Sequence, residues 1–339
     1  MKVARLYDFD DIRIEDAARP ELAADQILVK TAACGICSGD IMPWYMRRKA
    51  PLVLGHEPVG VVEEVGSAVR DFQPGQRVFV HHHAPCFQCA ACRRGQYVQC
   101  PTWRASKLIP GGMAEYFVAA AVNQRDTLPL PQTVSDHDGV LIEPGACVVK
   151  SLQRAGLKPG ESVAIIGLGI MGMMHVLLAR KLGASPIIGI DLLASRAARA
   201  RQMGADYGLL ADDRIEDQVR EVTAGAMADV VIVGPGSTAA LRTGLKLAGR
   251  AATVVQFTTT PPEEKLSLDM HDFYFNDLRL VASYSCGPDD TREALALVQS
   301  GVLSARDLVT HSFPLARFAE AFATAQREEA LKVVVTFGD

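Results

Sequence analysis

The sequence has no surplus of charge of one sign, no internal repeat and no low-complexity tract. Its 339 residues carry 35 Lys+Arg and 39 Asp+Glu, a formal charge of −4, so the charge gives no reason to expect nucleic acid or an anionic membrane as partner. Hydrophobic residues make up 49% and charged residues 22%, which excludes a disordered chain, a collagen-like chain and a coiled coil. At ~150 residues per domain, the length predicts two domains.

Long apolar stretches are also scarce. The N-terminal segment MKVARLYDFDDIRIED lacks the apolar core of a secretory signal, so we expect a cytoplasmic protein. The longest uncharged run covers residues 162–179, SVAIIGLGIMGMMHVLLA, which is near the length of a membrane span. It contains a histidine and three glycines at G-x-G-x-x-G spacing, so a buried strand, a tight turn and a helix start are favoured over a membrane helix.

Cysteine, in contrast, is plentiful, and four of the eight cysteines lie within 15 residues at C-x2-C-x2-C-x7-C spacing. Without an export signal, such a cluster indicates a metal site rather than disulfides. Structural zinc is favoured because it prefers four thiolates, with an iron–sulfur cluster or four free thiols as alternatives. Four thiolates leave no open position, so this metal would brace a lobe without catalysing. The predicted ligands are Cys86, Cys89, Cys92 and Cys100.

A second set of potential ligands is spread along the chain. Cys37 lies in GICSGD, His56 in GHE and Glu143 in LIEP. A catalytic zinc needs about three protein ligands of mixed type and a position for water or substrate, which Cys37, His56 and a glutamate could supply. From spacing alone, a structural histidine and a core cysteine remain good interpretations of His56 and Cys37.

The order of predicted elements indicates the fold class. Short β-prone runs separated by turn residues fill the first ~145 residues. Strands then alternate with helices predicted over 170–182, 194–203 and 237–247, which implies a parallel sheet with helices on both faces. After Cys286 two amphipathic helices and a terminal strand, LKVVVTF, follow.

A nucleotide site is predicted where the strand SVAII is followed by GLGIMG and a helix. The glycines permit a tight turn and the close approach of a pyrophosphate to the helix N-terminus. Asp191 ends the next β-run, where it would bond the adenosine ribose hydroxyls and repel a 2′-phosphate. Arg196 could meet adenine or a phosphate, or be solvated. A glycine-rich turn in an unrelated α/β domain is the alternative. The predicted cofactor residues are Gly167, Leu168, Gly169, Ile170, Met171, Gly172, Asp191 and Arg196.

Together these motifs resemble the zinc-dependent medium-chain dehydrogenase/reductase family, in its alcohol, sorbitol and threonine dehydrogenase branch. GICSGD, GHEPVGVVEEVG, the four-cysteine lobe, GLGIMG and the ending HSFPLARFAEAF occur in the family's order over essentially the whole length. The resemblance implies a GroES-like catalytic domain from residues 1–145 and 286–339, and a Rossmann domain from residues 146–285. It also implies an active site in the cleft, at the carboxyl ends of the parallel strands, and a homo-tetramer or homo-dimer, for which the apolar run ATVVQF is a candidate contact.

The resemblance further implies catalytic zinc ligands Cys37 and His56, with Glu57 or Glu143 as third. The Glu-Pro form at Glu143 resembles the sorbitol dehydrogenase branch. Two zinc ions per chain and NAD(H) are the expected cofactors. The expected activity is hydride transfer between NAD(H) and a secondary alcohol or polyol. A biosynthetic reductase of a polarised C=C or C=O bond, and a non-catalytic zinc-braced nucleotide-binding protein, are the alternatives.

The chain departs from the family where the proton relay normally lies. The family usually has Ser or Thr two residues after the zinc cysteine, and many members have His three residues further on; here these positions hold Gly39 and Met42. Neither side chain can carry a proton. Water, Ser38 or a carboxylate, Glu57 or Glu143, remain as routes, and Glu143 is favoured.

Two further features are predicted to be structural. His81, His82 and His83 are consecutive, and three adjacent side chains on a strand cannot all face one ion, so a local polar cluster is favoured over a third metal site. The isolated cysteines are predicted to be buried thiols, namely Cys34, Cys147 and Cys286.

Overall fold

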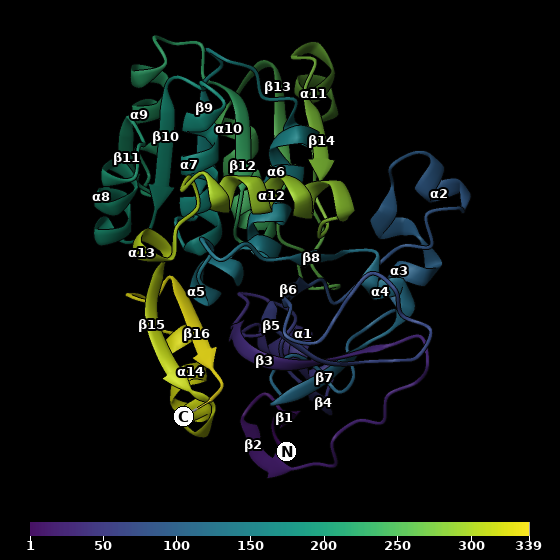
Figure 1. Cartoon of the computed structure of the whole chain (residues 1–339). Coiled ribbons are helices and arrows are strands. Elements are labelled where there is room, and N and C mark those ends of the chain that lie inside the picture. The colour runs from purple at the N-terminus through teal and green to yellow at the C-terminus, as the bar shows by residue number, and fades with distance from the viewer. Residues whose placement is uncertain (339) are drawn as a thin grey trace. The chain divides into compact units, whose positions relative to one another are not determined.

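The computed structural model describes residues 1–338, which fold as two compact units. One unit contains Met1–Ala146 and the segment from Cys286 onward; the other contains Cys147–Ser285 (Figure 1). Both ends of the chain therefore contribute to the first unit, and the second is a continuous insertion.

The second unit is built on a parallel six-stranded sheet with the order β11-β10-β9-β12-β13-β14. In chain order from β9 this is 3-2-1-4-5-6, the order of a Rossmann fold. The central strands consist of continuous apolar runs, such as VAII in β9, in which every residue is buried. This pattern is expected for a parallel sheet whose two faces are both covered. The strands are β9 (Val163–Ile166), β10 (Ile187–Asp191), β11 (Tyr207–Leu210), β12 (Ala228–Val233), β13 (Ala248–Gln256) and β14 (Arg279–Ala282).

Helices follow these strands and pack on the sheet (Figure 1). They are α7 (Ile170–Lys181), α8 (Ala194–Gln202), α9 (Ile215–Val222), α10 (Thr238–Leu247) and α11 (Met270–Phe275), while α6 (Ile142–Ala155) leads into the unit. The helices predicted over 170–182, 194–203 and 237–247 correspond to α7, α8 and α10, with ends one residue away at most. The prediction of a parallel-sheet Rossmann domain is confirmed.

The first unit contains a seven-stranded sheet with the order β15-β16-β3-β5-β6-β8, in which β7 also pairs with β3. A small sheet, β2-β1-β4, lies in the same unit. The prediction that this part of the chain is rich in β-strands is confirmed. The strands are β1 (Lys2–Asp8), β2 (Asp11–Asp16), β3 (Ile27–Gly35), β4 (Leu52–Val53), β5 (Pro58–Val65), β6 (Arg77–Val80), β7 (Tyr116–Ala119), β8 (Thr127–Pro129), β15 (Val309–Pro314) and β16 (Lys332–Thr336).

One strand pairing joins the two ends of the chain. β16, near the C-terminus, pairs antiparallel with β3, and Val335 lies opposite Cys34. β3 also pairs antiparallel with β5, with Cys34 opposite Pro58. The end of β3, the start of β5 and the start of β16 are thereby brought together. The helices of this unit are α1 (Pro43–Arg47), α2 (Ala90–Arg93), α3 (Pro101–Ala105), α4 (Ala121–Gln124), α5 (Asp136–Gly139), α12 (Pro288–Gln299), α13 (Ala305–Leu308) and α14 (Phe318–Ala325).

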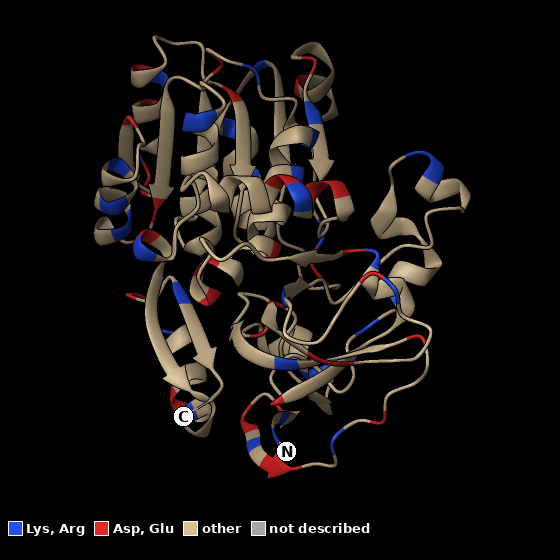
Figure 2. Ribbon diagram, in the orientation of Figure 1, with Lys and Arg blue, Asp and Glu red and all other residues tan. Residues whose placement is uncertain are grey.

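Residues of both charge signs are interspersed along the ribbon of each unit, as Figure 2 shows. The residue pattern of α8 is the local exception, because three of its nine residues are arginines. Within residues 1–338, no helix combines the length and the apolar character that crossing a membrane requires.

Candidate functional site

The sulfur atoms of the four clustered cysteines lie close together. The Sγ atoms are 3.5 Å apart for Cys89 and Cys92, 3.6 Å for Cys86 and Cys100, and 3.9 Å for Cys86 and Cys92. Tetrahedral zinc with Zn–S bonds of about 2.3 Å needs sulfur atoms about 3.8 Å apart. Backbone N–H groups of Cys86 and Cys89 point at Sγ atoms of the set, each at 3.4 Å. The donors therefore fit a structural zinc ion.

Three of the four predicted catalytic ligands also meet. The ligand atoms of Cys37, His56 and Glu57 all lie within 4.8 Å of one another. Cys37 follows β3, while His56 and Glu57 directly precede β5, so the β3–β5 pairing places them side by side. Gly55 makes the turn before His56 possible: its φ is +93°, and a Cβ there would lie 2.4 Å from the backbone nitrogen of Met113.

Glu57 is fully buried and forms an ion pair with Lys332, which is also buried. The Lys332 ammonium additionally donates to the carbonyl oxygen of Ile36 at 3.1 Å. Burial raises the pKa of the Glu57 carboxyl, and the positive charge of Lys332 opposes that shift. Oε1 of Glu57 has no hydrogen-bond partner among the described residues. A buried carboxylate oxygen left without a donor fits a metal ligand.

Asp40 orients two members of this set. Its Oδ1 lies 3.6 Å from Nδ1 of His56, and its Oδ2 accepts the backbone N–H of Cys37 at 3.2 Å. Burial alone would lower the pKa of His56, but the Asp40 carboxylate and Cys37 reverse this and raise it well above its ordinary value. A carboxylate on the second ring nitrogen is the usual support of a metal-binding histidine. GICSGD contains Asp40, but sequence reasoning assigned it no role.

Glu143 lies in a different group. It is buried near the start of α6, and its carboxylate lies within 4.8 Å of ligand atoms of His81 and Cys286. Its negative charge nevertheless raises the pKa of His56, so it acts on the Cys37 set electrostatically. Nδ1 of His81 is 2.6 Å from Oδ2 of Asp126, and both side chains are fully buried. Cys34 and Cys286 are fully buried, as predicted, whereas Cys147 is only partly buried, so that part of the prediction is wrong.

The structure also shows the surroundings of Gly39 and Met42, which occupy the positions of the family's usual proton-relay residues. The backbone N–H of Gly39 points at Sγ of Cys37 at 3.3 Å, and Met42 precedes α1 as its N-cap. A Cβ on Gly39 would lie 3.7 Å from Sγ of Cys37, which is an ordinary contact. The cysteine loop therefore has room for a side chain at Gly39, although the sequence does not supply one.

The three consecutive histidines differ from expectation in one respect, because β6 ends at Val80 and they follow the strand. Their partners also differ: His81 meets Asp126, and Nδ1 of His83 meets the carbonyl oxygen of Ser106 at 2.5 Å. The His82 ring packs against His56, with centroids 5.0 Å apart. The contacts of the three rings diverge, and His81 alone also lies in the group His81–Glu143–Cys286.

The predicted nucleotide site has the geometry of a phosphate-binding turn. Gly167 has a φ of +86°, and a Cβ on Gly172 would lie 2.0 Å from the carbonyl oxygen of Gly167. A Cβ on Gly169 would meet no atom within 4 Å, so the backbone there borders open space at the start of α7. Of the intervening side chains, Leu168 and Ile170 are buried and Met171 is half-buried. These features fit a dinucleotide pyrophosphate.

Asp191 ends β10 and is buried beside this turn. Its Oδ2 accepts the backbone N–H of Leu168 at 2.6 Å, and its Oδ1 accepts that of Leu193 at 3.0 Å. Each carboxylate oxygen has a second lone pair, which remains suitable for a ribose hydroxyl. Nη1 of Arg196 lies 4.0 Å from Oδ2 of Asp191. The structure therefore adds a role that the sequence did not reveal, because Asp191 also holds the glycine turn.

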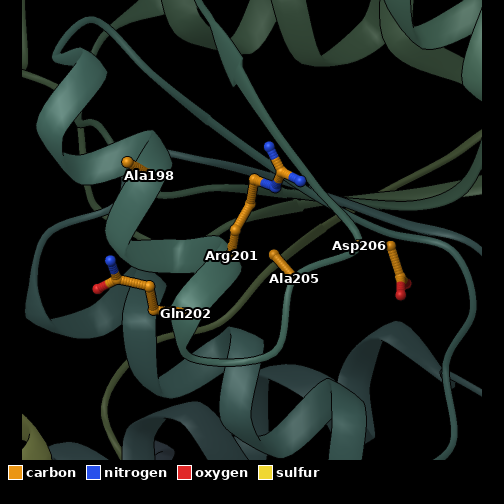
Figure 3. A pocket seen from close by; sticks show the side chains of 5 residues that line it. All are labelled: Ala198, Arg201, Gln202, Ala205 and Asp206. Atoms are coloured by element: carbon orange, nitrogen blue, oxygen red, sulfur yellow. The ribbon is translucent and has the colours of Figure 1, made fainter.

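A separate surface depression lies beside α8 (Figure 3). It contains none of the predicted site residues. It is lined by Ala198, Arg201, Gln202, Ala205 and Asp206.

Comparisons with known proteins agree over both units. Residues 23–132 match the family model described as alcohol dehydrogenase GroES-like domain, and residues 171–300 match that of zinc-binding dehydrogenase. Sorbitol dehydrogenase of Rattus norvegicus is 31% identical over 336 residues, covering 96% of this chain and 92% of the relative. Sorbitol dehydrogenase of Bacillus subtilis (strain 168) is 28% identical over 347 residues, covering 99% and 97%.

Solved structures of dehydrogenases also resemble this chain over nearly its full length. An alcohol dehydrogenase from Thermus sp. ATN1 superposes with a TM-score of 0.88 at 28% identity, covering 100% of both chains. A zinc-binding dehydrogenase from Sinorhizobium meliloti 1021, bound to NADP, superposes with a TM-score of 0.87 at 30% identity, covering 99% of this chain and 98% of that one.

Proposed function

This chain belongs to the zinc-dependent medium-chain dehydrogenases, and we propose that it transfers hydride between NAD(H) and a secondary alcohol or polyol, or the matching ketone. The observation that carries this proposal is the mixed Cys37–His56–Glu57 set with an unpartnered buried carboxylate oxygen. Relatives that act as sorbitol dehydrogenases support a polyol substrate over the reductase and the non-catalytic alternatives.

The protein's own residues prepare this site. Cys37, His56 and Glu57 would hold the catalytic zinc, which when bound supplies a Lewis acid for the substrate oxygen. The Asp40 carboxylate, 3.6 Å from Nδ1 of His56, favours one orientation of that ring, and Lys332 forms an ion pair with Glu57. The four-cysteine set would hold a second zinc that braces its lobe, so we propose two zinc ions for these two sets.

The glycine turn and Asp191 would hold the cofactor. The backbone at Gly169 gives access to a pyrophosphate, and the Asp191 carboxylate would accept the ribose hydroxyls while repelling a 2′-phosphate. We therefore propose NAD(H) over NADP(H). Arg196 weakens that discrimination because its guanidinium lies near the same carboxylate.

We assign the substrate proton to Glu143. Gly39 and Met42 cannot carry it, whereas Glu143 is buried and its charge acts on His56. A positioned acid–base group contributes about 10²- to 10⁴-fold in rate. Glu143→Gln should lower kcat by about that factor while the zinc content stays unchanged. If Glu143→Gln keeps its zinc and turns over at the wild-type rate, Glu143 is not the base. The matched control is Glu64→Gln, which makes the same change at an exposed position and should leave kcat unchanged.

We further propose a homo-oligomer in the cytoplasm. None of the eight cysteines, all of which lie within the described residues, forms a disulfide, which suits a reducing compartment. Residues 252–256 of the apolar run ATVVQF lie in β13, between β12 and β14, so they do not form an edge of this sheet. Support comes instead from the edge strand β14 and the neighbouring helix α11, where Tyr274 and Phe275 are 75% and 70% exposed. A monomer in light scattering at micromolar concentration would refute the oligomer.

The reaction itself is tested with zinc-loaded protein and a panel of polyols, simple alcohols, enals and ketones, by following NADH absorbance. Polyol oxidation with NAD is the expected result. Turnover of enals or ketones alone would favour the reductase, and no turnover with any substrate would favour the non-catalytic alternative.

A further inference from the structure

His82 is the one member of the three-histidine cluster whose role the fold does not explain. His81 is tied to Asp126 at 2.6 Å, and His83 is tied to the carbonyl oxygen of Ser106 at 2.5 Å. Among the described contacts, neither ring nitrogen of His82 has a hydrogen bond, and its Nδ1 is buried. Buried polar atoms without partners are rare in folded proteins, and each one calls for an explanation.

The position of His82 indicates what kind of partner its ring nitrogens could have. Its ring packs on the ring of His56, with centroids 5.0 Å apart and planes inclined by 52°. His82 therefore lies beside the proposed catalytic zinc ligands. It is not a further ligand of either group, because Cys37–His56–Glu57 and His81–Glu143–Cys286 each meet within 4.8 Å without it.

We propose that His82 binds a second hydroxyl group of the substrate, next to the hydroxyl that is oxidised. In a neutral imidazole one ring nitrogen donates and the other accepts, and a hydroxyl group can pair with either of them because it both donates and accepts. In a 1,2-diol the second hydroxyl lies on the neighbouring carbon, so a side chain packed against a zinc ligand is suitably near. A simple secondary alcohol has no group for this position and leaves the His82 nitrogen unpaired.

This inference rests on the proposed function and adds to it a preference for vicinal diols over simple alcohols. The preference arises from one neutral hydrogen bond, which is worth about tenfold in binding. The contribution of His82 is to orient and select the substrate, since it lies outside the predicted zinc ligands and the predicted base.

The test compares 2,3-butanediol with 2-butanol, which have the same carbon chain. His82→Phe keeps an aromatic ring against His56 but removes both ring nitrogens, and His82→Gln retains a donor and an acceptor. We expect His82→Phe to lower kcat/KM for the diol about tenfold and to leave that for 2-butanol within about twofold. His82→Gln should recover most of the diol activity. Zinc content and melting temperature should match the wild type in both variants.

A binding measurement separates this inference from the proposed function. Isothermal titration calorimetry of zinc-loaded protein with 2,3-butanediol should give about tenfold weaker binding for His82→Phe, whether or not the protein turns the diol over. Diol binding without turnover would refute the proposed reaction and leave the role of His82 intact. Equal losses for diol and 2-butanol, or unchanged diol binding in His82→Phe, would overturn the inference.

Discussion

Gly35 places a strict steric limit on the position of Glu57. A Cβ built on Gly35 would lie 1.9 Å from Oε2 of Glu57 and 2.9 Å from Cε of Lys332. Non-bonded carbon and oxygen atoms need at least about 3 Å, so Gly35→Ala forces the carboxylate to retreat by about 1 Å. Glu57 and Lys332 are both buried, so neither has free space into which to move.

The consequence for activity follows from that displacement. A misplacement of about 1 Å at a catalytic site costs about 10²-fold in rate, and overpacking a core position costs about 1–3 kcal/mol of stability. We expect Gly35→Ala to lower kcat/KM for a polyol about 10²-fold and to weaken zinc retention during dialysis against a chelator. The assays are NADH absorbance, zinc analysis and urea unfolding.

Gly39→Ala is the matched control for this experiment. It makes the same chemical change near Cys37, but the new Cβ would approach only Sγ of Cys37, at 3.7 Å. We expect its activity, zinc content and stability to stay near those of the wild type. If Gly35→Ala behaves as Gly39→Ala does, the position of Glu57 does not matter and its assignment as a zinc ligand is wrong.

Three other predictions follow from buried groups. Lys332→Met leaves the Glu57 carboxylate buried without its cation, so the free energy of unfolding in urea should fall by about 3–5 kcal/mol. Adding Glu57→Gln to this variant should restore part of the lost stability. An unchanged stability in Lys332→Met would contradict this prediction. Burial lowers the pKa of His175 from 6.5 to about 4 in the folded protein. As the pH drops below 6.5, His175 therefore takes up a proton in the unfolded chain but not yet in the folded protein, and the folded protein becomes less stable. At pH 5 the loss is about 2 kcal/mol relative to pH 7, and His175→Gln should flatten this dependence in urea unfolding; an unchanged slope would refute it. Asp191→Gly should relax the preference of kcat/KM for NAD over NADP, and a wild-type preference for NADP would shift the cofactor assignment to Arg196.

The parts that could be predicted from sequence are those with local determinants. The four clustered cysteines span 15 residues, and a single loop brings their sulfur atoms together. The glycine turn likewise depends on neighbouring residues, so the sequence predicts both the turn and the helix after it. The alternation of strands and helices identified the parallel sheet, and the structure confirms that fold class.

Contacts between distant segments could not be predicted in the same way. Lys332 reaches Glu57 only because β16 pairs with β3, and nothing in the local sequence of either residue indicates this. Cys286 and His81 are 205 residues apart, yet Sγ and Nε2 are separated by 3.6 Å. Asp40 lies in the motif GICSGD, but its role depends on its distance to His56, which the sequence does not give.

The central claim, that Cys37, His56 and Glu57 hold the zinc of a polyol dehydrogenase, is tested most directly by Cys37→Ser. Zinc content and polyol-dependent NADH formation are measured on the same preparations of wild type and variant. We expect about two equivalents of zinc and activity in the wild type, and about one equivalent, no activity and an intact fold in Cys37→Ser. Full zinc content and full rate in Cys37→Ser would contradict it.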